Sequence, residues 1–175
     1  MGKLEKGLVQ VYTGNGKGKT TAAFGLALRA IGRGLKVYVI QFIKGGFDYG
    51  ELYIADKLPN LTLKAFGMGK FIMEKPSAED IKSAEEALSL AEAVVKSGEY
   101  DIVILDEINV ALKLKLISLE RVLKLIKGKP KHVELVLTGR YSPNEIIEAA
   151  DLVTEMREVK HPYNKGYQAR KGIEF

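Results

Sequence analysis

Short apolar runs alternate with longer amphipathic stretches along the whole chain. Several of the apolar runs are β-branched and nearly continuous, as is typical of strands that are buried on both faces of a parallel sheet. The runs cover residues 8–12, 36–42, 61–66, 101–105, 132–138 and 152–156. This alternation predicts an α/β fold with a mostly parallel central sheet, helices on both faces, and ligands at the carboxyl ends of the strands.

The clearest helix is expected between Ser77 and Lys96. Ser77 and Asp80 have the spacing of a capping box at its start, and Gly98 is suited to ending it. One apolar stripe runs along the helix at Ile81, Ala84, Leu88, Ala91 and Val95. Such a stripe indicates a helix that packs one side against a core, so we interpret this segment as scaffold.

Two further helices are expected from their terminal residues. One spans residues 20–33, ends near two glycines and joins the first two strands. Another begins at Ser142, where Pro143 suits the first turn and Glu145 follows the candidate cap by three positions. No repeat, low-complexity tract or linker interrupts the pattern, so residues 1–175 are predicted to form a single domain.

Composition narrows the chemistry that the chain can perform. Of the 175 residues, 46% are hydrophobic and 28% are charged, which is ordinary for a soluble globular protein. Because there is no cysteine, disulfides, thiolate metal sites, iron–sulfur clusters and a cysteine nucleophile are excluded. His132 and His161 lack partners at metal-ligand spacing, and we expect them to have ordinary strand-edge and loop roles.

The charge pattern favours a small anionic ligand over nucleic acid. The net charge is +5, from 27 basic and 22 acidic residues, and the basic residues are scattered rather than arranged in a stripe. The N-terminus has no apolar stretch of signal-peptide length, and no later run approaches the ~20 apolar residues that span a bilayer. We therefore expect a cytoplasmic protein that binds neither nucleic acid nor membrane.

A glycine-rich loop after the first strand is the strongest functional signal. Its residues are Gly14, Asn15, Gly16, Lys17, Gly18, Lys19, Thr20 and Thr21. Closely spaced glycines let backbone N–H groups converge on phosphate oxygens at the start of a helix, where the helix dipole adds positive charge. Lys19 would reach the terminal phosphates, and Thr20 would ligate Mg²⁺. The alternative is a plain turn with an exposed lysine, but the order of strand, loop and helix favours a phosphate loop.

Two acidic residues supply the second half of the expected site. Asp106 and Glu107 follow the apolar run at residues 101–105, where the metal-supporting carboxylate of a phosphate-loop protein belongs. Spacing leaves open which of the two contacts the metal, because adjacent side chains on an extended segment point in opposite directions. Arg140 follows another strand and either contacts phosphate at the same rim or is a surface arginine. The segment 41–46 after the second strand likewise either contacts phosphate at this rim or lies at the surface.

Taken together, the motifs resemble those of the CobA-type ATP:corrinoid adenosyltransferases. The segments that carry the resemblance are GNGKGKTTAAFGLALRAIGRG, VIQFIKG, SGEYDIVILDEINVAL, KPKHVELVLTGRYSPNEIIEAADLVTEM and VKHPYNKGYQARKGIEF. They span nearly the whole chain in order, and they include a phosphate loop whose glycine-to-lysine spacing is one residue shorter than in the consensus GxxxxGK[ST]. The resemblance implies a RecA-like P-loop fold and an enzyme that transfers the 5′-deoxyadenosyl group of ATP to the Co(I) of a reduced corrinoid, releasing triphosphate.

The resemblance also implies roles for individual residues. Residues 14–21 would bind the triphosphate, with Lys19 and Thr20 as catalytic groups. Thr20 and Glu107 would hold Mg²⁺, with Asp106 as a supporting neighbour. Arg29 and Arg140 would contact the nucleotide.

The corrinoid side of the resemblance rests on a segment after the third expected strand. Phe71 falls on an aromatic position that helps to remove the lower axial ligand of the cobalt, and Met73 stands where many relatives have tryptophan. By apolarity alone, Phe71 would instead be a core residue. The family further implies a homodimer and an electron-donating flavoprotein reductant. Which corrinoid is the natural acceptor is left open.

Two other functions fit the residues less specifically. An ordinary P-loop ATPase or small-molecule kinase would hydrolyse or transfer the γ-phosphate without any corrinoid. A nucleotide-gated regulatory module would bind ATP and form no product. The full series of motifs favours adenosyl transfer over both.

Overall fold

Six parallel strands form the sheet at the centre of the molecule. The computed structural model describes residues 4–69, 72 and 75–175, and within them the strand order is β3-β2-β4-β5-β1-β6. The strands are β1 (Val9–Thr13), β2 (Val37–Gln41), β3 (Leu61–Ala65), β4 (Ile102–Asp106), β5 (Glu134–Thr138) and β6 (Leu152–Glu155). All neighbouring pairs in the described sheet are parallel, so the expected α/β fold is confirmed and the sheet is wholly rather than mostly parallel.

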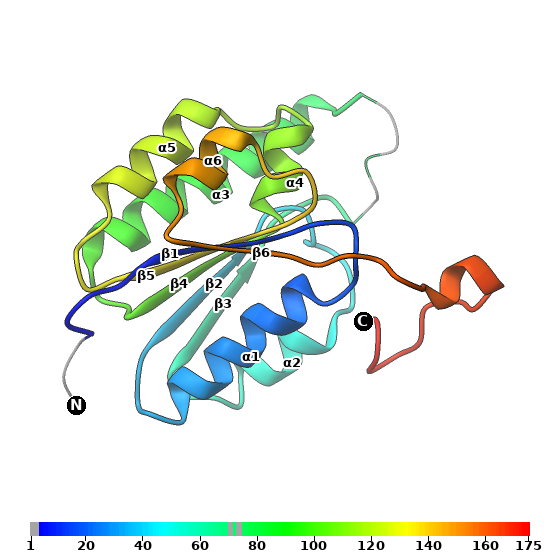
Figure 1. Ribbon diagram of the computed structural model, residues 1–175, viewed down its shortest axis with the longest axis horizontal. Helices are drawn as coiled ribbons and strands as arrows, with labels where there is room; N and C mark the ends of the chain where they lie inside the picture. The colour runs from blue at the N-terminus through cyan, green and yellow to red at the C-terminus, as the bar shows by residue number, and fades with distance from the viewer. Residues whose placement is uncertain (1–3, 70–71, 73–74) are drawn as a thin grey trace.

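Helices cover both faces of the sheet, as Figure 1 shows. One face carries α1 (Lys19–Ile31) and α2 (Gly50–Ala55). The other face carries α3 (Ala78–Ser97), α4 (Ile108–Lys113), α5 (Leu119–Gly128) and α6 (Asn144–Ala149). Two helices, α4 and α5, therefore lie between β4 and β5 along the chain. This layering buries the central strands β4 and β5 on both sides, whereas the edge strand β6 is exposed, and it explains why the central strands are almost continuously apolar.

Alternate side chains of each central strand enter two separate cores. In β4, Val103 and Leu105 pack in the core beneath α3 to α6, whereas Ile102 and Ile104 pack in the core beneath α1 and α2. The alternation follows from the two-residue period of a strand. Small residues of α1, among them Ala23 and Ala27, let that helix lie close to the sheet. The helix is thereby fixed with its first turn at the carboxyl edge of the strands.

The expected start and end of α3 are confirmed. The Ser77 hydroxyl accepts the Asp80 N–H at 3.2 Å, and the Asp80 carboxylate accepts the Ser77 N–H at 2.9 Å, which together form the capping box. Gly98 ends the helix in the left-handed conformation with φ of 61°. The capping box therefore satisfies two backbone donors that an uncapped helix would leave unpaired.

The expected start of α6 is wrong. Pro143 precedes the helix as its N-cap instead of lying in the first turn, and no side chain caps this end. The Ser142 N–H donates to the Thr13 hydroxyl at 3.3 Å, so Ser142 is bound to the end of β1 rather than to the helix. A tertiary contact thus replaces the local capping geometry that the sequence suggested.

The chain after β6 folds back to the phosphate loop. It first leaves the body of the molecule, makes a short 3₁₀ turn η1 (Pro162–Lys165), and returns so that its last residues lie near the start of α1 (Figure 1). There the Lys17 Nζ donates to the Ile173 carbonyl at 3.1 Å and to the Glu174 carboxylate at 2.8 Å.

Among the described helices, none has the length and apolarity required to cross a membrane.

Candidate functional site

The glycine-rich loop begins directly after β1 and packs against the segment that follows β6. Gly14 and Gly18 take left-handed backbone conformations, with φ of 92° and 116°, which other residues rarely adopt. The Gly16 N–H donates to the Met156 carbonyl at 2.6 Å. A Cβ atom at Gly14 would lie 2.5 Å from the Met156 carbonyl oxygen, and one at Gly16 would lie 2.7 Å from it. The loop therefore needs glycine for its backbone conformation as well as for its packing against Met156.

The Lys19 side chain binds the backbone of the glycine-rich loop. Its side chain is buried, and its Nζ donates to the Gly14 carbonyl at 2.8 Å and to the Gly16 carbonyl at 2.7 Å. Burial lowers the pKa of Lys19 below its ordinary value, although the Glu107 carboxylate opposes this effect. The lysine thus holds the loop in its curved form and keeps its ammonium group at the first turn of α1, where an anion is stabilised by the helix dipole.

Asp106 is the centre of a buried polar network at the end of β4. One carboxylate oxygen accepts the Thr20 hydroxyl at 2.9 Å and the Thr138 hydroxyl at 2.7 Å. The other accepts the Gln41 amide at 3.1 Å and the Lys44 ammonium at 2.8 Å. Burial alone would raise the pKa of Asp106, but Lys44 and the hydrogen bonds outweigh it and lower the pKa, so the group is a carboxylate.

Glu107 faces the neighbouring cavity instead. Its backbone takes the left-handed conformation with φ of 62°, which is uncommon for a residue with a side chain. The Glu107 N–H donates to the Thr138 hydroxyl at 3.0 Å, which helps to hold this turn. Burial and the adjacent Asp106 charge raise the pKa of Glu107. The sharp turn therefore separates two consecutive carboxylates, one committed to the protein and the other available to a ligand.

The donor set fits a magnesium ion that is bound together with a nucleotide. Within the described residues, no group of three or more His, Cys, Asp or Glu side chains is placed to hold a metal ion. Mg²⁺ commonly takes only one or two protein oxygens and completes its octahedron with phosphate and water. The Thr20 hydroxyl and the Glu107 carboxylate border the same cavity and are oxygen donors of this kind.

A cavity of about 630 Å³ joins these groups at the carboxyl edge of the sheet. Its walls come from the phosphate loop and first turn of α1 (residues 16–21), from residues 49–51 and 54 at α2, and from residues 172–175 of the C-terminal segment. Lys44, Glu107 and Arg140 also border it. The volume lies in the range of sites that enclose small molecules.

The structure brings most of the predicted site residues together. Gly16, Lys17, Gly18, Lys19, Thr20, Thr21, Glu107 and Arg140 all border the cavity. Asp106 lies behind them and is fully buried. Gly14 and Asn15 belong to the same loop without bordering the cavity, and the Lys17 ammonium is turned toward Glu174.

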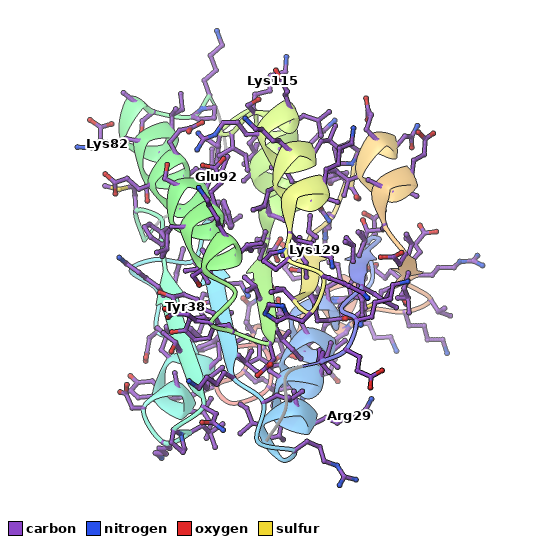
Figure 2. All side chains as sticks on the ribbon, turned by 90° about the vertical axis from the view of Figure 1, so that its left-hand side faces the viewer. Arg29, Tyr38, Lys82, Glu92, Lys115 and Lys129 are labelled. Atoms are coloured by element: carbon purple, nitrogen blue, oxygen red, sulfur yellow. The ribbon has the colours of Figure 1, made fainter. Side chains whose placement is uncertain are left out.

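The structure does not bring Arg29 to this cavity. Arg29 lies exposed in the last turn of α1, whereas the phosphate loop lies before the first turn. In Figure 2, which looks onto the amino-terminal edge of the strands, Arg29 projects outward from the end of its helix. The expected contact between Arg29 and a nucleotide in this cavity is therefore not found within the chain. Phe71 and Met73, which were expected to face a corrinoid, lie outside the described residues.

Four polar residues in and around the site have contacts that the sequence did not predict, although Gln41 and Lys44 lie in the segment 41–46 that was a candidate for phosphate contact. Thr138 and Gln41 bind Asp106 from the two strands beside β4, and Lys44 does so from the loop after β2. The Glu51 carboxylate lies 3.5 Å from the Gln41 amide and 3.7 Å from the Lys44 ammonium. The available signal for Gln41, Lys44 and Thr138 was their position at or just after the carboxyl ends of strands that share one edge, but the pairing of Gln41 with Asp106 depends on a register that the sequence does not reveal.

These features define a P-loop type of protein. They are a glycine-rich loop that ends in Lys19 and Thr20, and carboxylates at the end of a separate parallel strand. The model of the family described as ATP:corrinoid adenosyltransferase BtuR/CobO/CobP matches residues 5–175, and the chain belongs to this family. It is 41% identical to a corrinoid adenosyltransferase of Pseudomonas aeruginosa, over 98% of this chain and 85% of that protein. It is 37% identical to a corrinoid adenosyltransferase of Escherichia coli K12, over 98% of this chain and 87% of that protein.

Proposed function

We propose that this chain is a corrinoid adenosyltransferase that transfers the 5′-deoxyadenosyl group of ATP to the cobalt of a reduced corrinoid and releases triphosphate. Family membership over residues 5–175 supports the reaction class. The observation that carries the proposal is that Lys19, Thr20, Glu107 and Arg140 border one cavity at the start of α1. These groups are suited to receiving negative charge on a polyphosphate and a magnesium ion beside it.

The chemistry requires stabilisation of a leaving group more than proton transfer. The Co(I) electron pair forms a bond to C5′ of the ribose, the bond from C5′ to the triphosphate oxygen breaks, and its electrons leave with the triphosphate. The cobalt is formally oxidised to Co(III). Negative charge therefore grows on the departing triphosphate, and the cobalt itself is the nucleophile, so no protein base is needed.

The residues of this chain would divide that work. The Lys19 ammonium, the backbone N–H groups at the first turn of α1 and the Arg140 guanidinium would stabilise charge on the triphosphate. Thr20 and Glu107 would hold Mg²⁺, which when bound neutralises part of that charge. Asp106 would act behind them, because its hydrogen bond fixes the Thr20 hydroxyl at 2.9 Å.

Other parts of the proposal rest on the sequence pattern, for the domain and the location, and on the family resemblance, for the dimer, the reductant and the corrinoid contacts. We propose that residues 1–175 form a single domain, that the enzyme is a cytoplasmic homodimer, and that a flavoprotein reductant supplies electrons to the cobalt. Phe71 and Met73 would contact the corrinoid. Sedimentation in solution tests the dimer. For Phe71→Ala, the reaction started from Co(II) should suffer much more than the reaction started from Co(I), and equal losses would remove Phe71 from the ligand-stripping role.

The decisive experiment is incubation of the protein with ATP, Mg²⁺ and chemically reduced cobalamin. The expected products are a light-sensitive adenosylated corrinoid and inorganic triphosphate in equal amounts. Lys82→Met, an exposed substitution on α3 (Figure 2), serves as the control and should react like the unaltered protein. Release of ADP and inorganic phosphate without any corrinoid would overturn the proposal in favour of an ordinary ATPase or kinase. Saturable ATP binding without any product would favour a regulatory module.

A further inference from the structure

Lys44 is a second, largely buried lysine that borders the same cavity as Lys19. Its side chain is only 13% exposed. Its ammonium lies 2.8 Å from the Asp106 carboxylate, 3.1 Å from the Thr20 hydroxyl and 3.7 Å from the Glu51 carboxylate. The face of the Tyr49 ring lies below it, with 5.1 Å between Nζ and the ring centroid. The ammonium thus has oxygen atoms and an aromatic face around it, as a bound cation would.

The Lys44 ammonium lies close to the hydroxyl that would bind a metal ion at Thr20. A magnesium ion contacts its oxygen ligands at about 2.1 Å, and the Lys44 ammonium lies 3.1 Å from the Thr20 hydroxyl, so an ion bound to that hydroxyl would lie at most about 5 Å from the Lys44 Nζ. Two cations at such a separation repel each other strongly in a site with little water. The observed position of Lys44 therefore opposes metal binding at Thr20.

We propose that Lys44 is an exchangeable counter-ion: it holds Thr20 and Asp106 until a metal ion arrives with the nucleotide, and it then turns to the triphosphate. The inference rests on the proposed function, whose leaving group is the anion that receives Lys44. The side chain already borders the same cavity as Lys19 and Arg140, so a rotation about its flexible stem is enough to reach that anion. Lys44 would thereby become a further charge-stabilising residue for the departing group.

Removing the Lys44 charge should change two binding affinities in opposite directions. A metal ion alone should bind more tightly, because its competitor is gone and the Asp106 carboxylate has lost its cation. Inorganic triphosphate with the metal should bind more weakly, because one cationic contact to the anion is lost. A residue that only maintained the fold would weaken both kinds of binding together. Opposite changes in the two affinities would therefore distinguish an exchangeable counter-ion from a purely structural lysine.

The test uses Lys44→Met, which keeps the length of the stem and removes the charge. Binding of Mn²⁺ alone is measured by electron paramagnetic resonance, and binding of inorganic triphosphate with Mn²⁺ is measured by calorimetry. A charge-assisted hydrogen bond of ordinary strength corresponds to a shift of roughly tenfold in each dissociation constant, downward for Mn²⁺ and upward for triphosphate. Lys82→Met is the matched control, and it should change neither constant.

Lys44→Gln is the second variant, because it keeps an N–H donor for Asp106 and protects the fold if the methionine variant is unstable. It is expected to give the same opposite shifts. Unchanged Mn²⁺ binding, unchanged triphosphate binding, or a parallel loss of both in the folded variant would overturn the proposal. Since neither measurement contains a corrinoid, these results are distinct from a failure of adenosyl transfer.

Discussion

Replacing Asp106 by asparagine tests the buried network on which the site is built. The asparagine has nearly the same shape as the aspartate. By turning its amide, it can accept from Lys44 and Gln41 and donate to the hydroxyls of Thr20 and Thr138. The substitution therefore removes the negative charge and little else, and it leaves the Lys44 ammonium without the carboxylate that now lies 2.8 Å away.

The expected loss in the free energy of unfolding is large for a change of one atom. Removing one partner of a buried ion pair typically costs about 3–5 kcal/mol, because the remaining charge stays in a medium of low polarity. Since asparagine keeps the hydrogen bonds, we expect the lower end, about 3 kcal/mol. In the double variant with Lys44→Met, the cation that lost its nearest carboxylate is gone, so part of this loss should be recovered, with a coupling of roughly 1–3 kcal/mol.

Urea unfolding at neutral pH measures these values. Asp101→Asn is the matched control: Asp101 precedes the same strand at its other end, and its carboxylate accepts the Lys36 N–H at 2.8 Å without an ion pair. It should cost only about 1 kcal/mol. A loss for Asp106→Asn no larger than that of the control, or strict additivity with Lys44→Met, would refute the reasoning.

The same pair has a pH signature. The folded pKa of Asp106 lies below its ordinary value of 3.8, so its contribution to stability is fully present above that value. As the pH falls through the folded pKa, the carboxylate is protonated and the contribution is lost. The difference in unfolding free energy between the unaltered protein and Asp106→Asn should therefore be constant at neutral pH and shrink in acid below 3.8.

Three further predictions concern the loop and the scaffold. Lys19→Ala should lower the turnover of adenosylated product roughly a hundredfold, about 3 kcal/mol of leaving-group stabilisation, in a saturating-substrate assay; turnover near that of the unaltered protein would argue against its role. Gly16→Ala should lose about 1–3 kcal/mol in urea unfolding because its Cβ would meet the Met156 carbonyl, whereas Gly25→Ala, with open space around it in α1, should gain about 0.5–1 kcal/mol. Equal effects of the two alanines would contradict this. Ser77→Ala should lose about 1 kcal/mol with its helix cap, and an unchanged melting temperature would show that the cap contributes nothing.

Much of the fold could be predicted because the central strands of the sheet are buried on both faces. Strands such as β4 and β5 must then be apolar at nearly every position, and the pattern is visible without any tertiary information. The cap of α3 was equally predictable, since both of its partners lie within four residues. The start of α6 was not, because the backbone of Ser142 binds Thr13, a residue 129 positions away. Local signals fail where a distant partner competes for the same group.

The residues of the candidate site also fall into those that local patterns predict and those that depend on distant partners. Lys19, Thr20 and a carboxylate after β4 were predictable because they adjoin a loop or strand end with a recognisable pattern, but the pattern left open which of Asp106 and Glu107 faces the cavity. The bonds of Lys44 and Gln41 to Asp106 depend on strand register and order, which no single segment specifies. The distance of Arg29 from the loop was within reach of simple geometry. Ten residues along a helix at 1.5 Å each place it about 15 Å from Lys19.

The contact between Gly16 and Met156 limits how this scaffold can be rebuilt. An ordinary nucleotide loop carries one more residue, and here that residue would have to displace the backbone that leaves β6. Anyone who grafts a standard hydrolase loop onto this protein must therefore redesign the exit of the sixth strand as well. The two segments, more than a hundred positions apart in the gene product, form one exchangeable module for protein engineering.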